Sequence, residues 1–239
     1  MELVVVIVIV AVMATIAVRT LKSSYEITRI EQTKEELDQL ARAIAGRPDI
    51  LSGGQRTDYG YIGDVGAMPP NLDALVNNPG GYNTWDGPYV HDDFYAGVTG
   101  SETEFMIDAW GDAYAYSGGI TITSEGGGKP IIREIAPSLE VLLSNLVSTV
   151  ITDIDHTPPG IDYLDSLHVG LIHPDGFGSM IHRWTTVGSG GRVEFEAVPI
   201  GCHLLRVVYI PTGDTITRWV DVAPGQDYHL TVTLPEDYW

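Results

Sequence analysis

Carboxylates and hydroxyls in two loops are the side chains of this chain whose spacing could bind a cation. In the loop over residues 153–165, Asp153 and Asp155 stand two positions apart, and Ser124 and Glu125 are adjacent in a second stretch. Oxygen atoms of these kinds are the ligands that Ca²⁺ prefers, and the ion takes about six to eight of them. Neither stretch supplies that number or the full EF-hand pattern. We therefore interpret residues 153–165 as a solvated loop and the stretch with Ser124 and Glu125 as a turn. A calcium site is the alternative for each.

Catalytic motifs are missing from the sequence. It contains no HExxH, no GxSxG and no GxxxxGK[ST]. Glu194 and Glu196 share one face of a predicted strand, and paired carboxylates can serve a glycosidase, but this spacing also suits an exposed strand face, which we favour. His168, His173 and His182 flank strands and are expected at the strand surface. We expect no enzymatic activity and no cofactor.

Charge divides the chain into two parts. The 239 residues carry a net charge of −19. Residues 1–56 hold 7 basic and 7 acidic side chains, whereas residues 57–239 hold 6 basic and 25 acidic ones. No basic stripe is present, so nucleic acid is excluded as a partner. Cys202 is the single cysteine, which rules out a disulfide within the chain, and its apolar surroundings predict a buried, inert thiol.

The N-terminal part of the chain is predicted to form a long helix. Leu3 to Val18 contains no charged residue, glycine or proline, and Arg19 and Lys22 follow it. This run approaches the roughly 20 apolar residues that a bilayer core demands. Apolar residues then recur at helical spacing at Ile27, Ile30, Leu37, Leu40 and Ile44. The pattern predicts one continuous helix of about 65–70 Å, ending near Ala45 before a Gly-Arg-Pro sequence.

Glu2 is the exception in the apolar half of this helix. An isolated carboxylate in a bilayer is costly and calls for a partner. A buried group of opposite charge would offset the cost of desolvating the carboxylate. A carboxylate that interacts with the helix N-terminus is the other interpretation.

The N-terminal sequence resembles the mature start of type IV pilins. The residues that carry the resemblance are Glu2, Leu3, Val4, Val5, Val6 and Ile7. It implies that Glu2 faces the N-terminal amine of a neighbouring subunit and sets the register of assembly. It also implies that three residues and a leader, cut by a prepilin peptidase, precede Met1. Ala11 and Arg19 stand where many pilins have a helix-breaking glycine and proline.

Two aromatic motifs follow a short helix or turn predicted at residues 71–76. The motif residues are Trp85, Gly87, Pro88 and Tyr89, then Asp108, Trp110, Gly111, Tyr114 and Tyr116. In this order they resemble the major pseudopilin of type II secretion, with Ala109 in place of a proline of the family pattern. The family's calcium loop would fall at residues 120–128, where its aspartates are absent.

The last hundred residues read as an added β-domain. Seven short strands separated by Pro- and Gly-containing turns predict a β-sandwich. The expected strands are 147–154, 167–173, 180–187, 192–197, 202–210, 215–222 and 227–234. The stretch from Val193 to Tyr209 resembles carboxypeptidase-regulatory-like, transthyretin-like modules, which implies a structural or binding unit.

Together these features predict an α+β protein with a long N-terminal α-helix, a small pilin-type α/β head and a C-terminal all-β sandwich. The expected divisions are residues 1–46 (1–18 spanning the membrane or lying in a filament core), 47–137 and 138–239. The expected function is a subunit of an extracellular type IV pilus-like filament. Its partners would be copies of itself, the inner membrane before assembly, the prepilin peptidase and the pilus assembly machinery. Alternatives are a periplasmic major pseudopilin of type II secretion and a membrane-anchored binding or enzymatic β-domain.

Overall fold

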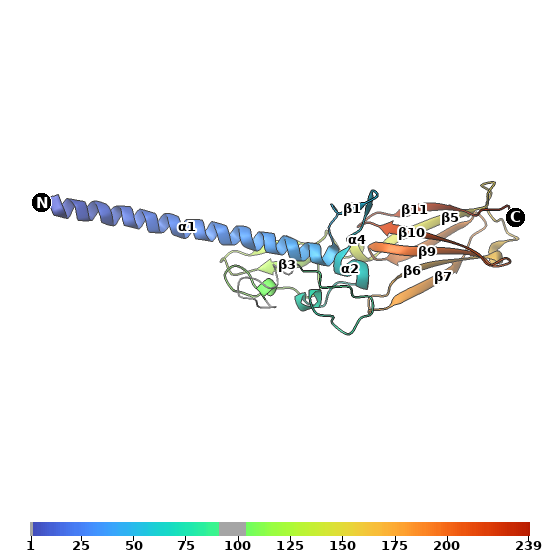
Figure 1. Ribbon diagram of the computed structural model, residues 1–239, viewed down its shortest axis with the longest axis horizontal. Coiled ribbons are helices and arrows are strands. Elements are labelled where there is room, and N and C mark those ends of the chain that lie inside the picture. Colours follow the sequence, from blue (N-terminus) through green and yellow to red (C-terminus); the bar gives the residue numbers. More distant parts are fainter. Residues whose placement is uncertain (1, 91–103) are drawn as a thin grey trace.

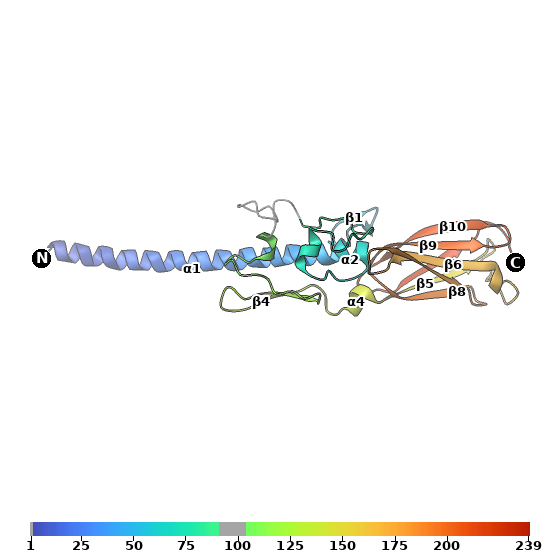
Figure 2. The ribbon, with the colours of Figure 1, turned by 90° about the horizontal axis from the view of Figure 1, so that it is seen from below.

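Helix α1 (Glu2–Ala45) runs unbroken for 44 residues and projects from one end of the molecule (Figure 1). The computed structural model describes residues 2–90 and 104–239, and for Glu2 the backbone only. The C-terminal strands form the opposite end, so the molecule is elongated (Figures 1 and 2). A long helix joined to separate sheets confirms the predicted α+β class.

The helix ends where the sequence predicts, at a glycine. Gly46 has a left-handed φ of +75°, and its N–H donates to the carbonyl of Arg42 over 2.6 Å. A Cβ at this position would lie 2.2 Å from the backbone oxygen of Asp58, so a side chain cannot be accommodated. Arg56 donates to the carbonyl of Ala45, which satisfies another free carbonyl of the last turn.

The head is a set of short elements packed along the second half of α1. They are β1 (Leu51–Ser52), β2 (Gln55–Arg56), α2 (Gly60–Val65), η1 (Leu72–Leu75), η2 (Glu104–Met106), β3 (Thr121–Ser124), β4 (Ile131–Glu134) and α4 (Glu140–Leu143). Leu37, Leu40 and Ile44 are fully buried in the head's hydrophobic cluster. Ile27, from the same predicted stripe, is exposed, although the neighbouring Glu26 contacts the head.

Seven strands follow, as the sequence predicts. They are β5 (Asn145–Thr152), β6 (Leu167–Pro174), β7 (Met180–Thr186), β8 (Arg192–Val198), β9 (Gly201–Tyr209), β10 (Asp214–Val222) and β11 (Tyr228–Thr233), with a 3₁₀ turn, η3 (Leu164–Ser166), before β6. The alternation of buried and exposed residues along β8 and β9 is the period of a half-buried strand.

These strands form a two-layer sandwich (Figure 2). One sheet has the order β10-β9-β6-β7 and is antiparallel throughout. The other has the order β11-β5-β8, with β11 parallel to β5. A second hydrophobic cluster, including Val147, Leu171, Phe195 and Val207, fills the space between the sheets.

The head and the β-domain are in direct contact. Ile200, between β8 and β9, belongs to the hydrophobic cluster of the head. The turn between β6 and β7 also reaches the head, where Gly176 donates to the carbonyl of Val65 over 2.9 Å and the carbonyl of Gly178 accepts from Asn83 over 2.9 Å. The divisions at residues 46 and 137 stay predictions, since α1 and Ile200 both contribute to one cluster.

Candidate functional site

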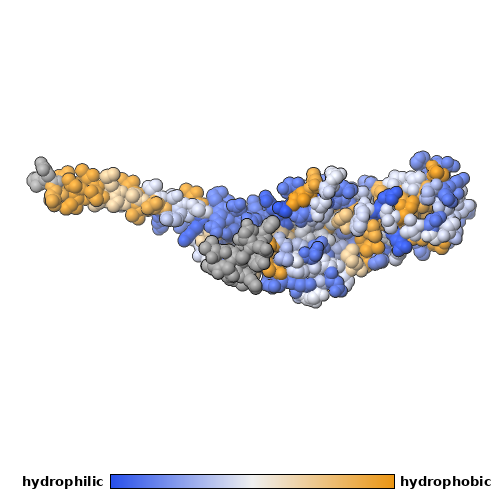
Figure 3. Space-filling model, in the orientation of Figure 1, coloured by the Kyte–Doolittle hydropathy of each residue, from blue (hydrophilic) through white to orange (hydrophobic). Residues whose placement is uncertain are grey.

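The first half of α1 is a bare apolar surface. The large side chains from Leu3 to Val18 are between 54% and 72% exposed, and Figure 3 shows this half as a continuous hydrophobic rod. Among the described residues, α1 is the one helix long and apolar enough to cross a membrane, with a mean hydropathy of 2.7 in its most apolar window. A membrane anchor and a signal sequence share that property. The helix continues without a break through Ala11 and Arg19.

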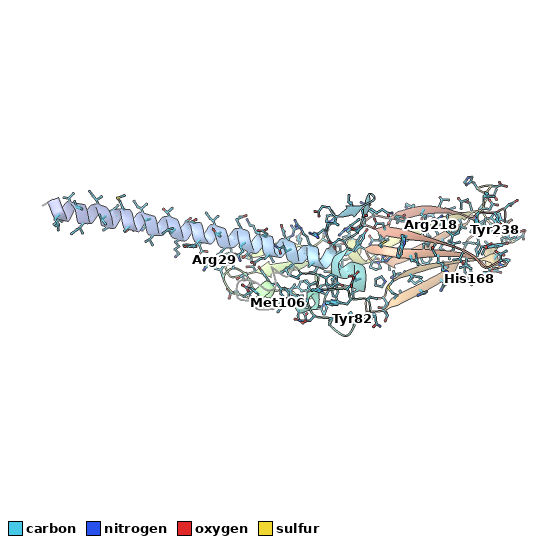
Figure 4. All side chains as sticks on the ribbon, in the orientation of Figure 1. Arg29, Tyr82, Met106, His168, Arg218 and Tyr238 are labelled. Atoms are coloured by element: carbon cyan, nitrogen blue, oxygen red, sulfur yellow. The ribbon has the colours of Figure 1, made fainter. Side chains whose placement is uncertain are left out.

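The predicted assembly residues lie at the tip of this rod. Leu3, Val4, Val5, Val6 and Ile7 are all exposed and helical. Glu2 is the first residue of the helix, and its side chain lies outside the described residues. The structure thus places five exposed side chains and the backbone of Glu2 in the part of α1 that projects beyond the described residues of the head (Figure 4).

Polar contacts fix the second half of the helix to the head. The indole N–H of Trp110 donates to Glu26 over 3.2 Å, and the hydroxyl of Tyr114 donates to Glu36 over 2.6 Å. The N–H of Ala109 donates to the hydroxyl of the buried Thr33. These contacts join residues about eighty positions apart, and we call them the helix clamp, defined by Trp110, Tyr114 and Ala109. Arg133 of β4 adds an ion pair with Asp38 over 3.0 Å.

Asp108 holds the loop that presents the helix clamp. Its carboxylate accepts from the hydroxyl of Ser124 over 2.6 Å and from the backbone N–H groups of Trp110, Asp112 and Gly126. Burial raises the pKa of Asp108, but these four hydrogen bonds favour the charged form and leave the pKa below its usual value. Asp108 therefore acts as a structural anion, and the following glycine, Gly111, turns the loop with a left-handed φ of +91°.

The other head motif builds a second aromatic cluster. The indole of Trp85 donates to the carbonyl of Ala74 over 2.9 Å and meets the ring of Tyr89 edge-on at 5.7 Å. Tyr89 in turn donates to Asp64 over 2.8 Å. A Cβ on Gly87 would lie 2.3 Å from the indole of Trp85, so this position requires glycine. Pro88 follows it in the chain.

Tyr116 completes the set of motif residues. Its hydroxyl donates to the carbonyl of Pro69 over 3.1 Å. Pro69 lies just before η1, whose first turn is capped by the side chain of Asn71 accepting from Ala74. This is the short helix that the sequence predicts at residues 71–76.

The candidate calcium residues lie in two different parts of the molecule. Ser124 is buried and uses its hydroxyl to donate to Asp108, while Glu125 is exposed. Asp153 is fully buried rather than solvated, which corrects the expected solvated loop at this position. Its carboxylate accepts from both the N–H and the hydroxyl of Thr157. Asp155 is exposed.

A convergent set of metal ligands is not found in residues 2–90 and 104–239. Within those residues, no group of three or more His, Cys, Asp or Glu side chains is arranged to hold an ion. Calcium therefore stays a prediction that rests on residue types alone.

Two side chains of the β-domain differ from expectation. His173 is buried, not at the strand surface, and its ring lies 5.7 Å from that of His203, which is 1% exposed. Cys202 is exposed, not buried. All three follow from strand parity: Leu171 and Leu205 point into the core, so His173 and His203 do too, while Cys202 points out. His168 and His182 are exposed, as expected.

Cys202 lies on the side of the four-stranded sheet that faces away from the core, and this side forms a broad surface. Cross-strand partners share a face, so the register identifies the residues of the four-stranded sheet that point away from the core. We call this surface the outer face. It consists of His168, Gly170, Ile172, Met180, His182, Trp184, Thr186, Cys202, Leu204, Arg206, Val208, Thr215, Thr217, Trp219 and Asp221.

Comparisons with known proteins do not assign a family. No family model matches the chain, and no curated protein matches it. Parts of it are similar to solved structures. One is a proposed carbohydrate-binding protein from Pseudomonas aeruginosa, at 15% identity over 38% of this chain and 89% of that one, with a TM-score of 0.25. Another is the Bacillus anthracis TIE protein, at 10% identity over 51% and 24%, with a TM-score of 0.31. A third is S.CueP, at 10% identity over 47% and 72%, with a TM-score of 0.28. Similarities of this size carry no argument about function.

Proposed function

We propose that this protein is a structural subunit of a type IV pilus-like extracellular filament. The observation that carries the proposal is the division of α1 into two halves. Its first half is apolar on every side and uncovered, whereas its second half packs one side against the head and is fixed by the helix clamp. The head and the bare rod are therefore joined through one continuous helix, as a subunit that packs by its helix requires.

The uncovered first half of α1 occupies two environments in succession. As a precursor, the subunit keeps Leu3 to Val18 in the inner membrane, with Arg19 and Lys22 at the headgroup boundary. After processing by a prepilin peptidase, the assembly machinery transfers the helix into the core of the filament. Helices of neighbouring copies then replace lipid around the exposed side chains, so the apolar surface never meets water.

Glu2 gives the transfer its direction and register. A carboxylate among hydrocarbon is unfavourable unless a positive group neutralises it. The N-terminal amine of a neighbouring copy is such a group. Each new subunit would stop at the position where the two charges meet, which fixes the axial step between copies.

A periplasmic pseudopilus is the alternative for the same helix. Its subunit would use the same packing but form a short fibre inside the cell envelope. The head motifs resemble that family, whereas the large β-domain, which extends far from the helix, suits display on a long surface fibre (Figure 1). An anchored β-domain with a ligand of its own is the third candidate, and it requires no polymer.

Electron microscopy of material sheared from the producing cells tests the proposal, with the fibre subunit identified by mass spectrometry. Long fibres made of this chain, with a mature N-terminus three residues upstream of Met1, are the expected result. Protein that stays in the cell envelope with a processed N-terminus would favour the pseudopilus. An unprocessed, monomeric protein would overturn both and leave the anchored β-domain.

A further inference from the structure

The outer face of the four-stranded sheet differs from the rest of the body in its charge. The chain has 32 acidic residues and 13 basic ones, yet this face bears a single carboxylate, that of Asp221. Asp221 lies at one corner, and its carboxylate accepts from the backbone N–H of Arg56 in the head over 3.2 Å. The outer side of the other sheet, by contrast, carries Glu194 and Glu196.

The outer face is also unusually apolar for an exposed sheet. Trp219 on edge strand β10 is 62% exposed, Trp184 on the opposite edge strand β7 is 44% exposed, and Met180 at the end of β7 is also exposed. Gly170 has no side chain, and the six-membered ring of Trp184 occupies the space a Cβ would take. A shallow hollow of about 340 Å³ remains between His168, Trp184 and Val208. Exposed apolar surface of this kind, rimmed by polar groups, is typical of an interaction site.

A cation, Arg206, stands at the centre of the outer face. Arg206 of β9 stands between Thr217 and Gly170 in the register, and it is exposed. It forms no salt bridge with any residue in the described ranges 2–90 and 104–239, unlike Arg192, which pairs with Glu194 on the other sheet. An exposed guanidinium flanked along its strand by Leu204 and Val208 is suited to bind a carboxylate of another molecule.

We infer that the outer face docks a second copy of this chain within the filament. The inference rests on the proposed function. Two bodies as acidic as this one repel each other wherever their carboxylates meet, and the outer face, with its single carboxylate, is a surface where that repulsion is weak. A neighbour's acidic surface can face Arg206 there while its apolar groups cover Trp184 and Trp219.

The geometry of such a contact suits a polymer. The two sheets lie in separate layers (Figure 2), with the outer face on one and Glu194 and Glu196 at exposed positions of β8 in the other. A contact between two different surfaces of the same chain is heterologous, and a heterologous contact that does not close into a ring repeats without limit. The β-domains would thus form an outer layer of contacts, in addition to those of the helices.

Cys202 provides a native probe of this contact, because it is the single cysteine and it lies on the outer face. The rate of its reaction with a maleimide is measured in intact fibres and in the detergent-solubilised wild-type chain. A control chain carries Cys202→Ser and Asp155→Cys, which moves the thiol to an exposed loop outside this face.

Slower reaction of Cys202 in fibres by several-fold, with no change at position 155, is the expected result. Equal rates for Cys202 in fibres and in the free chain would overturn the docking inference and leave the filament intact as a proposal. Absence of wild-type fibres would overturn the proposed function and the docking inference with it.

Reversing the charge of Arg206 provides a second test of the contact at the outer face. Arg206→Glu is expected to lower the shear force or detergent concentration that breaks the fibres, because it places carboxylate against carboxylate. Arg218→Glu is the matched control, since Arg218 is exposed on the neighbouring strand but lies off the outer face. Equal fibre strength for both variants would contradict docking at this face.

Discussion

The hydroxyl of Tyr114 donates to the carboxylate of Glu36 over 2.6 Å, and this contact ties the head to the second half of α1. Glu36 lies one residue before Leu37, where the buried stripe of the helix begins. Burial raises the pKa of Tyr114 and keeps its hydroxyl protonated, so it remains a donor at all physiological pH values.

Removing that hydroxyl tests the helix clamp. Tyr114→Phe keeps the ring in place but leaves Glu36 without its donor. Hydrogen bonds to charged groups contribute about 1.5–3 kcal/mol, so we expect a loss of that order in the free energy of unfolding. Chemical denaturation in detergent measures it. Tyr25→Phe is the control, because Tyr25 is 68% exposed on the same helix, and an equal loss in both variants would contradict the clamp.

Packing of the helix against the head is tested at Leu40. This side chain is fully buried in the head cluster. Leu40→Ala should destabilise the protein by about 2–5 kcal/mol, through lost burial and the cavity left behind. Ile27→Ala removes a similar side chain from the exposed part of the helix and should change stability by less than about 0.5 kcal/mol. A small effect at Leu40 would mean that the helix is not held by this cluster.

The buried histidine pair predicts a loss of stability in acid. Burial lowers the pKa of His203 to about 4, and it lowers that of His173 as well. Between pH 6.5 and 4 the unfolded chain therefore binds more protons than the folded one, so stability is present above pH 6.5 and falls as the pH decreases toward 4. For His203 the full loss is about 3 kcal/mol.

Comparing the pH dependence of the free energy of unfolding in the wild type and in a His203 variant isolates the contribution of that histidine. Asp64 acts in the opposite sense, because burial raises its pKa to about 6 and favours the folded state in acid. The difference in stability between the wild type and His203→Gln is therefore measured from pH 7.5 to 4.5. We expect that difference to shrink as the pH falls. A difference that stays constant would show that His203 does not titrate differently on folding.

The loop around Asp108 gives a prediction about calcium. Ser124→Ala removes a buried donor from the Asp108 carboxylate and should cost about 1–3 kcal/mol. Glu125→Ala, at an exposed neighbour, should have little effect. Because hydrogen bonds already satisfy Asp108, excess Ca²⁺ should leave the unfolding midpoint of the wild type unchanged. If Ca²⁺ raised the unfolding midpoint of the wild type but not that of Glu125→Ala, the calcium alternative would be established instead.

Elements with a strong sequence period could be predicted, and contacts between distant residues could not. The apolar run and the stripe through Ile44 define α1, and Gly46 marks its end, because both signals are local. The seven strands of the β-domain were also recognisable from turn residues. Their pairing was not, since the parallel contact of β11 with β5 joins strands some eighty residues apart.

The expectations for Cys202 and His173 were wrong about which face of its strand each side chain occupies. Cys202 was expected to be buried because its strand is apolar on both faces, with Leu204 and Val208 on the outer side. Such a strand does not reveal which face is the core. For His173 the signal was present, since it follows Leu167, Val169 and Leu171 at a spacing of two. The partner of Asp153 could be found only in the folded turn, where Thr157 supplies both donors.

The central claim is that the N-terminal helix assembles the protein into a filament with Glu2 as its register residue. The most direct measurement counts sheared fibres by electron microscopy for the wild type, Glu2→Ala and Glu31→Ala, with the membrane fraction of each quantified in parallel. Glu31 is the matched control, because it is an exposed carboxylate of the same helix whose ion pair with Lys34 lies at the surface. We predict fibres from the wild type and Glu31→Ala, and none from Glu2→Ala despite normal membrane insertion. Normal fibres from Glu2→Ala would contradict the claim.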